Sequence, residues 1–199
     1  LFNLFSDKAI ISLPQPFRSF IAYIIAKQRT PKAQGIYHQM GGASPILSNT
    51  QEQAKALEEK LGPSFVVYPV MRYWNPRAHE VIQRLDQDIS HVVLMPLYPQ
   101  YSTTTTESSY LEIRDLLKKY HFKGQVSFRC CYPLNTGWIQ ALTDLIRNAL
   151  KSLPAGPYRL LFTAHGLPEN VIKKGDPYQF QVESTVKAVV KNLGEVDWK

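Results

Sequence analysis

The chain has 199 residues, 44% of them hydrophobic and 20% charged, a composition that fits an ordinary globular protein and excludes a coiled coil or a disordered tail. Its formal net charge is +7, but Lys and Arg are spread along the chain, without the basic block interleaved with aromatic residues that is typical of nucleic-acid binding. We therefore expect no nucleic-acid partner. No apolar run approaches the roughly 20 residues of a membrane-spanning helix.

The first predicted elements lie in an apolar region. The chain begins without Met, inside the apolar pattern of residues 1–10, and its last residues follow a helical pattern as though they entered another strand. We expect that both ends are cut from a longer chain. Residues 17–29 predict a short apolar helix with basic flanks. This pattern favours a core helix over an apolar lip that touches a membrane or an apolar ligand.

Apolar strands and helices alternate over the rest of the chain. The predicted strands are 64–74, 91–100, 125–133 and 158–166, and the predicted helices are 76–88, 108–120, 137–153 and 178–193. Continuous apolar strands that alternate with helices predict a parallel sheet covered on both faces, the doubly wound α/β class. A weak point near residues 121–125 divides the chain into two predicted domains, 1–126 and 127–199.

In sheets of this class, ligands bind outside the carboxyl ends of the strands. The loop at residues 98–109 begins at such an end, is rich in Thr and Ser, and leads into a helix. Its hydroxyl groups either cap that helix or bind a phosphate or carboxylate, and judged by itself the pattern favours capping. Arg72 and Tyr73, at another strand end, fit an ordinary structural pair and an acidic or planar ligand equally well.

Two other segments argue against common sites. Residues 40–45, "MGGASP", predict a glycine turn before a helix, but they lack the G-x-G-x-x-G spacing, so we expect no dinucleotide site. Cys130 and Cys131 are the only cysteines, and neighbours on a strand point to opposite faces. We therefore expect neither a disulfide framework nor a C-x-x-C metal site, and a reducing compartment is the default.

His165 stands where the apolar run of residues 158–164 ends and Gly166 and Pro168 follow. An imidazole has an ordinary pKa near 6.5, so it accepts a proton or binds a metal at neutral pH. Loop histidines also serve as caps, and the spacing alone fits both roles. The sequence contains no nucleophile elbow and no H-E-x-x-H motif, so neither a hydrolase triad nor a complete protein metal site is expected.

Several of these segments resemble the ferrochelatases, which insert ferrous iron into a porphyrin as the last step of protohaem synthesis. The resemblance rests on residues 1–14, 29–46, 71–76 ("MRYWNP"), 98–109 ("YPQYSTTTTESS") and 162–178 ("FTAHGLPENVIKKGDPY"), in the family's order. It implies two similar Rossmann-like domains with a porphyrin cleft between them. Because family members are longer, it also implies that this chain lacks the opening strand and the C-terminal half with its iron-side glutamate. We expect the second domain to be incomplete and this piece to be inactive by itself.

The resemblance implies a role for individual residues. His165 is the implied base that takes a pyrrole proton, or a contact of the iron, held in place by Gly166 and Pro168. The implied porphyrin-binding residues are Arg29, near the propionates, and Tyr37, Ser44, Arg72, Tyr73, Tyr98 and Tyr110, which line the pocket or its wall. Residues 17–27 then resemble the apolar lip through which the porphyrin enters.

Two positions depart from the family. Some members carry an iron–sulfur cluster with a cysteine ligand where this chain has Thr103, so the resemblance excludes a cluster that uses that ligand. Glu107 replaces a common glycine, which alters the loop or adds charge near the cleft. We expect no permanently bound cofactor, with ferrous iron as a substrate. The expected partners are the porphyrin and iron, in a cytoplasmic protein that contacts the inner membrane peripherally.

Other functions fit part of the same sequence. Coproporphyrin is an alternative substrate, although the sequence of residues 71–74 and 98–106 more closely resembles the family members that use protoporphyrin. A flavodoxin-like module that binds FMN through its Thr and Ser loop is a second alternative, which leaves residues 164–168 and 175–178 unexplained. A porphyrin carrier without catalytic activity is a third.

Overall fold

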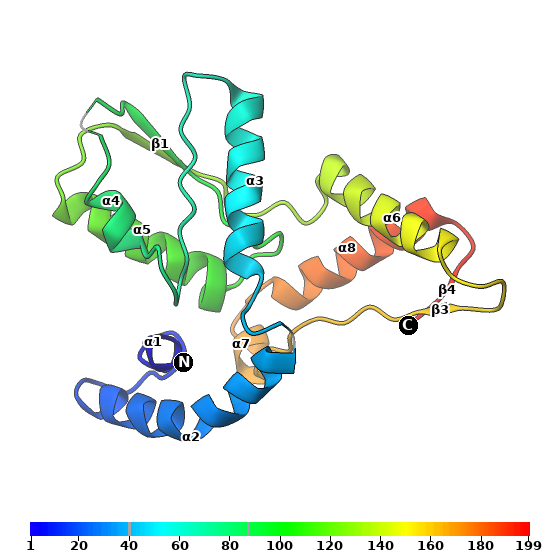
Figure 1. Cartoon of the computed structure of the whole chain (residues 1–199), viewed down its shortest axis with the longest axis horizontal. Coiled ribbons are helices and arrows are strands. Elements are labelled where there is room, and N and C mark those ends of the chain that lie inside the picture. The colour runs from blue at the N-terminus through cyan, green and yellow to red at the C-terminus, as the bar shows by residue number, and fades with distance from the viewer. Residues whose placement is uncertain (40, 87) are drawn as a thin grey trace. The chain divides into compact units, whose positions relative to one another are not determined.

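The computed structural model describes residues 1–39, 41–86 and 88–199, and they divide into two compact units. Unit 1 contains residues 1–90 and 111–125, and unit 2 contains residues 91–110 and 126–199. Figure 1 shows the order of the helices and strands along the chain.

Unit 1 is helical. It contains α1 (Phe2–Phe5), α2 (Phe17–Gln39), α3 (Ile46–Leu61), α4 (Ala78–Ile82) and, from residue 111, most of α5 (Ser108–Lys119). Helix α1 packs on α2, and α3 is followed by its C-cap Gly62, whose positive φ of 87° favours glycine.

The core of unit 1 lies between α4 and α5. Ala78 and Ile82 of α4 pack with Leu117 of α5, and partly buried Ile113, Leu116 and Tyr120 surround them. These apolar residues of α5 and the turn after it recur every three or four positions, so they share one face of the helix. Gly124 lies so close to the Ser90 carbonyl that a Cβ atom there would come within 2.5 Å of the oxygen.

Unit 2 combines short strands with helices. It contains β1 (His91–Leu94), all but the first residue of β2 (Gln125–Phe128), the π-helical turn η1 (Thr103–Glu107), α6 (Thr136–Lys151), β3 (Arg159–Leu160), α7 (Glu169–Lys173), α8 (Tyr178–Leu193) and β4 (Asp197–Trp198). Helix α6 packs on α8. Strand β3 pairs in parallel with β4, with Arg159 opposite Asp197.

The second strand pair, β1 with β2, is also parallel. The N–H of Gln125 donates to the Ser90 carbonyl at 2.8 Å, and the N–H of Arg129 donates to the Leu94 carbonyl at 2.9 Å. Both partners therefore advance along the chain in the same direction. Helices that alternate with parallel strands confirm the predicted α/β class.

Several predicted elements are confirmed. The helices expected at 108–120, 137–153 and 178–193 are α5, α6 and α8, and the strand expected at the end of the chain is β4. The helix expected at 17–29 continues to Gln39, and the one expected at 76–88 is only α4, Ala78–Ile82, with Gln87 outside the described residues. Met40, the first residue of the predicted glycine turn, also lies outside them.

The predicted strand at 64–74 is wrong. Among the described residues, this segment forms a single bridge, between Met71 and Arg77, and Phe65 and Val66 are exposed. The apolar run has the composition of a buried strand, but a strand needs a hydrogen-bonded neighbour along its length, and this segment has one only at Met71. The strands predicted at 91–100 and 125–133 end early, β1 before Pro96 and Pro99, which have no N–H to donate to a ladder.

The premise that Cys130 and Cys131 lie on a strand, with their side chains on opposite faces, is wrong, although both thiols are free of a disulfide. Strand β2 ends at Phe128, so the two side chains are not on an alternating strand, and their Sγ atoms lie 3.0 Å apart on the same side.

Among the described residues, none of the helices combines the length and the apolar character that are needed to cross a bilayer.

Candidate functional site

His165 lies on the exposed segment that follows β3. Ladder hydrogen bonds continue past the strand, since the N–H of Phe162 donates to the Lys199 carbonyl at 2.9 Å. Beyond Phe162 the backbone is irregular until α7 begins at Glu169. The imidazole is exposed, and among the described residues none forms a hydrogen bond or ion pair with it. The ring therefore has both nitrogens open to solvent or to a ligand.

Among the residues that the structure describes, no protein metal centre accompanies His165. Within the described ranges, no group of three or more His, Cys, Asp and Glu side chains is arranged to hold a metal ion.

Asp176 joins the segment that follows His165 to the Thr-rich loop. Its Oδ2 atom accepts hydrogen bonds from the Ser102 hydroxyl at 3.0 Å, from the Thr103 N–H at 2.8 Å and from the Thr103 hydroxyl at 2.8 Å. Its Oδ1 atom accepts from the N–H of Tyr178, in the first turn of α8, at 3.0 Å. Asp176 is 7% exposed and Ser102 1% exposed, so this is a buried, fully engaged carboxylate.

The hydrogen bonds control the charge of Asp176. Burial would raise the pKa of this carboxyl group, because it disfavours the charged form. The donors from Thr103, Tyr178 and Ser102 outweigh burial and lower the pKa below its ordinary value. Asp176 is therefore an anion at neutral pH and forms strong, charge-assisted hydrogen bonds.

The Thr-rich loop is organised from within and by α8. Ser102 caps η1, since its hydroxyl accepts from the Thr104 N–H at 3.1 Å, which confirms the prediction of capping. The N–H of Tyr101 donates to the Gln181 side chain at 2.7 Å, and the Gln100 side chain donates to Thr185 at 3.0 Å. The anion at this helix start is Asp176 of the protein itself, which occupies donors that a phosphate would need.

Glu107 lies next to a tyrosine of the same loop. Burial raises the pKa of Tyr101 above its ordinary value, and the negatively charged Glu107, which accepts a hydrogen bond from the Tyr101 hydroxyl, raises it further. Glu107 thus adds charge beside this loop.

No role for Asp176 was predicted from the sequence. The signal was the Gly-Asp-Pro-Tyr run, in which Asp176 stands two residues before α8 begins at Tyr178.

The aromatic residues predicted for the porphyrin wall in unit 2 lie at the two ends of this loop region. Tyr98 is half-buried at its start. Tyr110, in the first turn of α5, stacks on Phe128 of β2 with ring centroids 4.4 Å apart and an angle of 24° between the planes. The interactions of the described residues do not link either tyrosine to His165.

In unit 1, Arg72 and Tyr73 meet Asp7. Arg72 donates to Asp7 Oδ2 at 2.7 Å, and the Tyr73 hydroxyl donates to the same oxygen at 2.9 Å. Arg72 also donates to Glu112 of α5, and Arg77 lies 3.6 Å from that carboxylate. The side chains of Arg72 and Asp7 are 15% and 12% exposed. Arg72 therefore anchors the N-terminal segment by charge, with a half-buried second carboxylate beside it.

The other predicted residues of unit 1 are more open. Arg29 is exposed on α2, with its guanidinium 5.8 Å from the centre of the Phe5 ring, and no carboxylate of the described residues pairs with it. Tyr37 is exposed in the last turns of α2. Ser44 is exposed before α3, and its hydroxyl accepts from the Ile46 N–H at 3.4 Å. Residues 1–7 thus contact both Arg29 and the Arg72–Tyr73 pair.

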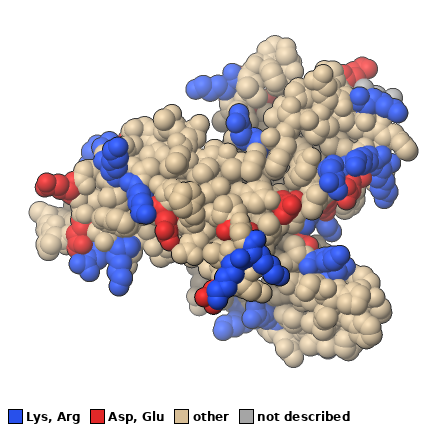
Figure 2. Space-filling view, turned by 180° about the vertical axis from the view of Figure 1, so that it is seen from behind, with Lys and Arg blue, Asp and Glu red and all other residues tan. Residues whose placement is uncertain are grey.

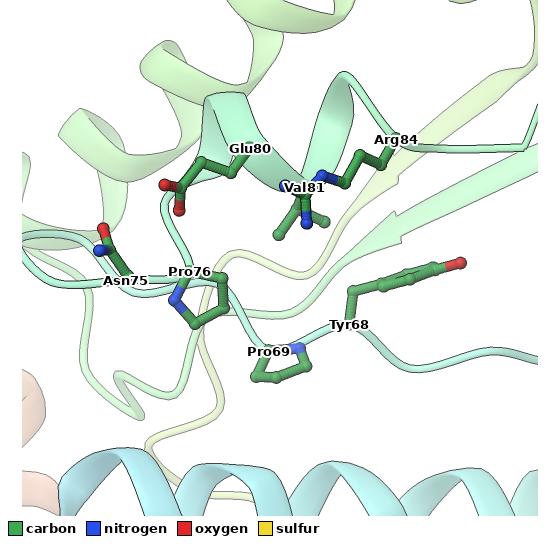
Figure 3. A pocket seen from close by; sticks show the side chains of 7 residues that line it. All are labelled: Tyr68, Pro69, Asn75, Pro76, Glu80, Val81 and Arg84. Carbon is green, nitrogen blue, oxygen red and sulfur yellow. The ribbon is translucent and has the colours of Figure 1, made fainter.

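Two shallow hollows lie in unit 1. The first, of about 440 Å³, is drawn in Figure 3, where Glu80 and Val81 of α4 and nearby Arg84 lie above Tyr68 and Pro69, with Asn75 and Pro76 at one side. It contains no predicted site residue. The second, of about 410 Å³, lies between α1 and α2 and is lined by Phe2, Tyr23, Ala26, Lys27, Thr30 and Pro31. It adjoins the predicted apolar lip.

The surface charges do not form one block on the face that Figure 2 shows. Lys and Arg appear there in several separate groups with acidic side chains between them.

Comparison with known proteins provides independent evidence about the family of this chain. The model of the family described as "Ferrochelatase" matches residues 1–199. A protein named "Ferrochelatase" from Pelagibacter ubique (strain HTCC1062) is 46% identical over 206 residues, which cover 100% of this chain and 59% of the relative. The protein of that name from Rickettsia felis is 45% identical with the same coverage, and that from the Wolbachia of Brugia malayi is 43% identical over 231 residues, 68% of its length.

The chain thus spans about three fifths of the length of the first two of these relatives. The family match covers every segment from which the resemblance was drawn, including the loop that carries His165 and the Gly-Asp-Pro-Tyr run with Asp176. The chain belongs to the ferrochelatase family.

Proposed function

We propose that the full-length protein that contains this chain is a ferrochelatase, which inserts ferrous iron into protoporphyrin IX to form protohaem. The observation that carries the proposal is the family match over residues 1–199, within which an exposed histidine follows a parallel strand. The relatives named "Ferrochelatase", at 43–46% identity, support the same activity.

We propose that His165 is the catalytic base. Insertion of a metal requires that two pyrrole protons leave and that a nitrogen lone pair tilts out of the ring plane. A neutral imidazole open to a ligand accepts such a proton, whereas one already bonded to the protein would have to break that bond first. The exposed ring of His165, without a partner among the described residues, supports this role or a direct contact with the iron.

The porphyrin is proposed to bind through both charge and apolar contact. Arg29 suits a propionate, because it is exposed and no described carboxylate neutralises it. Arg72 and Tyr73 belong to the proposed site as well, but Asp7 and Glu112 already hold Arg72, so it orders the site more than it attracts a new anion. The remaining proposed contacts are Tyr37, Ser44, Tyr98 and Tyr110.

Helix α2 is the proposed apolar lip. Phe17, Phe20 and Tyr23 are 65%, 66% and 58% exposed, near the hollow between α1 and α2. Exposed aromatic residues on one helix suit a large apolar macrocycle. We propose that the same residues touch the inner membrane peripherally, in a cytoplasmic protein.

We propose that the protein uses no resident cofactor and that iron enters as a substrate. Thr103 stands where some family members have a cluster-ligating cysteine, and both its N–H and its hydroxyl donate to Asp176. A hydroxyl engaged in this way is no substitute for a thiolate ligand.

Metal insertion by the purified full-length protein tests the proposal. We expect the protein to form protohaem from protoporphyrin IX and ferrous iron under anaerobic conditions. The change in the visible spectrum measures this reaction. A higher kcat/KM with coproporphyrin would change the assigned substrate. Tight porphyrin binding without insertion would make the protein a carrier, and a flavin spectrum in the purified protein would replace the proposal by the flavodoxin-like alternative.

A further inference from the structure

The two cysteines form a close pair that the proposed iron insertion does not use. The Sγ atoms of Cys130 and Cys131 lie 3.0 Å apart, nearer than two sulfur atoms that merely pack, and both thiols are free. Both side chains are partly exposed, so small reagents reach them. The pair lies entirely within unit 2.

The backbone on both sides fixes this arrangement. Before the pair, the N–H of Arg129 donates to the Leu94 carbonyl at 2.9 Å. After it, the N–H of Tyr132 donates to the Pro99 carbonyl at 2.8 Å, and the Tyr132 hydroxyl donates to the Pro96 carbonyl at 3.2 Å. Two anchors flanking two residues limit how far the thiols separate, so their proximity belongs to the fold.

We propose that Cys130 and Cys131 form a dithiol modification site, which closes to an intramolecular disulfide by exchange with a small disulfide such as oxidised glutathione. One thiolate attacks the reagent, forms a mixed disulfide and releases one glutathione thiolate. The second cysteine then attacks the protein sulfur of the mixed disulfide and releases the second glutathione. Two thiol protons are lost, and the two electrons of the dithiol end on the glutathione pair.

The local electrostatics set the order of the two steps. Burial, a hydrogen bond with Cys131 and the charge of Cys131 raise the pKa of Cys130 to about 11. Cys130 is therefore protonated at neutral pH, so Cys131 makes the first attack. Once Cys131 is in a mixed disulfide, it no longer raises the pKa of Cys130, and the Cys130 thiol beside it ionises more easily and completes the ring.

Differential alkylation of the full-length protein tests the site. After treatment with oxidised glutathione and then iodoacetamide, trypsin releases residues 130–147 as one peptide, because cleavage follows Arg129 and Arg147. We expect this peptide to have lost two hydrogen atoms, to carry no glutathione and to react with iodoacetamide only after reduction. A peptide with two alkylated thiols, or with glutathione retained, would overturn the proposal.

The matched variants are Cys130→Ser and Cys131→Ser. Each keeps one thiol in place, so the remaining cysteine of the Cys130→Ser variant should retain glutathione, because no neighbour displaces it. Phenylarsine oxide gives a second readout on the unaltered protein: its arsenic bonds to both sulfurs and releases water. We expect it to protect both thiols from iodoacetamide, and unprotected alkylation would contradict the close pairing even if a variant failed to fold.

Discussion

Asp176 and Thr103 are joined twice, since the N–H and the hydroxyl of Thr103 both donate to the same carboxylate oxygen at 2.8 Å. The two residues are 73 positions apart in the sequence. Thr103 is the first residue of η1, and Asp176 ends the segment that begins with His165 and leads into α8. This connection fixes two strand-end loops of unit 2 to each other.

Removal of the Asp176 carboxylate should destabilise unit 2. Asp176→Ala leaves the buried Ser102 hydroxyl and the Thr103 N–H without their acceptor, which we expect to cost about 3 kcal/mol. Asp144→Ala is the matched control, because that carboxylate is exposed on α6, where it accepts a surface hydrogen bond from Gln140 at 2.8 Å and lies 3.9 Å from Arg147. Urea unfolding of the full-length protein should show a change within about 0.5 kcal/mol for the control. Equal losses in both variants would contradict the assigned role.

The stabilisation by Asp176 should depend on pH. The pKa of Asp176 is lowered in the folded protein, so the charged form is favoured by folding. Its contribution is fully present above the unfolded value of about 3.9 and is lost as the pH falls through the lower folded value. The difference in unfolding free energy between the wild type and Asp176→Asn, which does not titrate, should therefore shrink below about pH 4. A difference that stays constant from pH 7 downward would show that charge is not involved.

The sequence predicted the three helices α5, α6 and α8 better than the strands or the loop contacts. Helices α5, α6 and α8 have apolar residues on one face, and this periodicity can be recognised in the local sequence without knowing which elements pack against the helix. The strand expected at 64–74 depends on a partner that no local pattern specifies. Asp176 was visible in the Gly-Asp-Pro-Tyr run, but its partners Ser102 and Thr103 are distant in sequence, so their contact required the fold.

Gly124 should tolerate no side chain. A Cβ atom there would lie 2.5 Å from the Ser90 carbonyl oxygen, so Gly124→Ala forces the backbone to move, and we expect a loss of about 1–3 kcal/mol. Gly35→Ala provides the opposite case, because Gly35 lies inside α2 and a Cβ atom there would have nothing within 4 Å. That variant should gain about 0.5–1 kcal/mol from higher helix propensity. Thermal unfolding compares the two, and a neutral Gly124→Ala would refute the close contact.

Substitution of Arg72 should affect mainly stability, and substitution of Arg29 should affect mainly substrate binding. Arg72→Ala leaves the carboxylates of Asp7 and Glu112 without their shared partner, so we expect a loss of about 2–3 kcal/mol. Arg29→Ala should leave unfolding nearly unchanged, because Arg29 is exposed, but should raise KM for the porphyrin more than it lowers kcat. Urea unfolding and steady-state kinetics together check this division. A stable Arg72→Ala protein with a raised KM would instead make Arg72 a direct substrate contact.

Turnover of the full-length His165→Ala variant tests the central claim most directly. The matched control is His79→Ala, which removes another exposed imidazole, on α4 in unit 1. If His165 accepts a pyrrole proton, the rate of iron insertion into protoporphyrin IX should fall about 100- to 10,000-fold in His165→Ala, with porphyrin affinity little changed, while His79→Ala keeps its rate. A rate for His165→Ala close to that of the control, with the same porphyrin affinity, would contradict the assignment of His165 as the catalytic base.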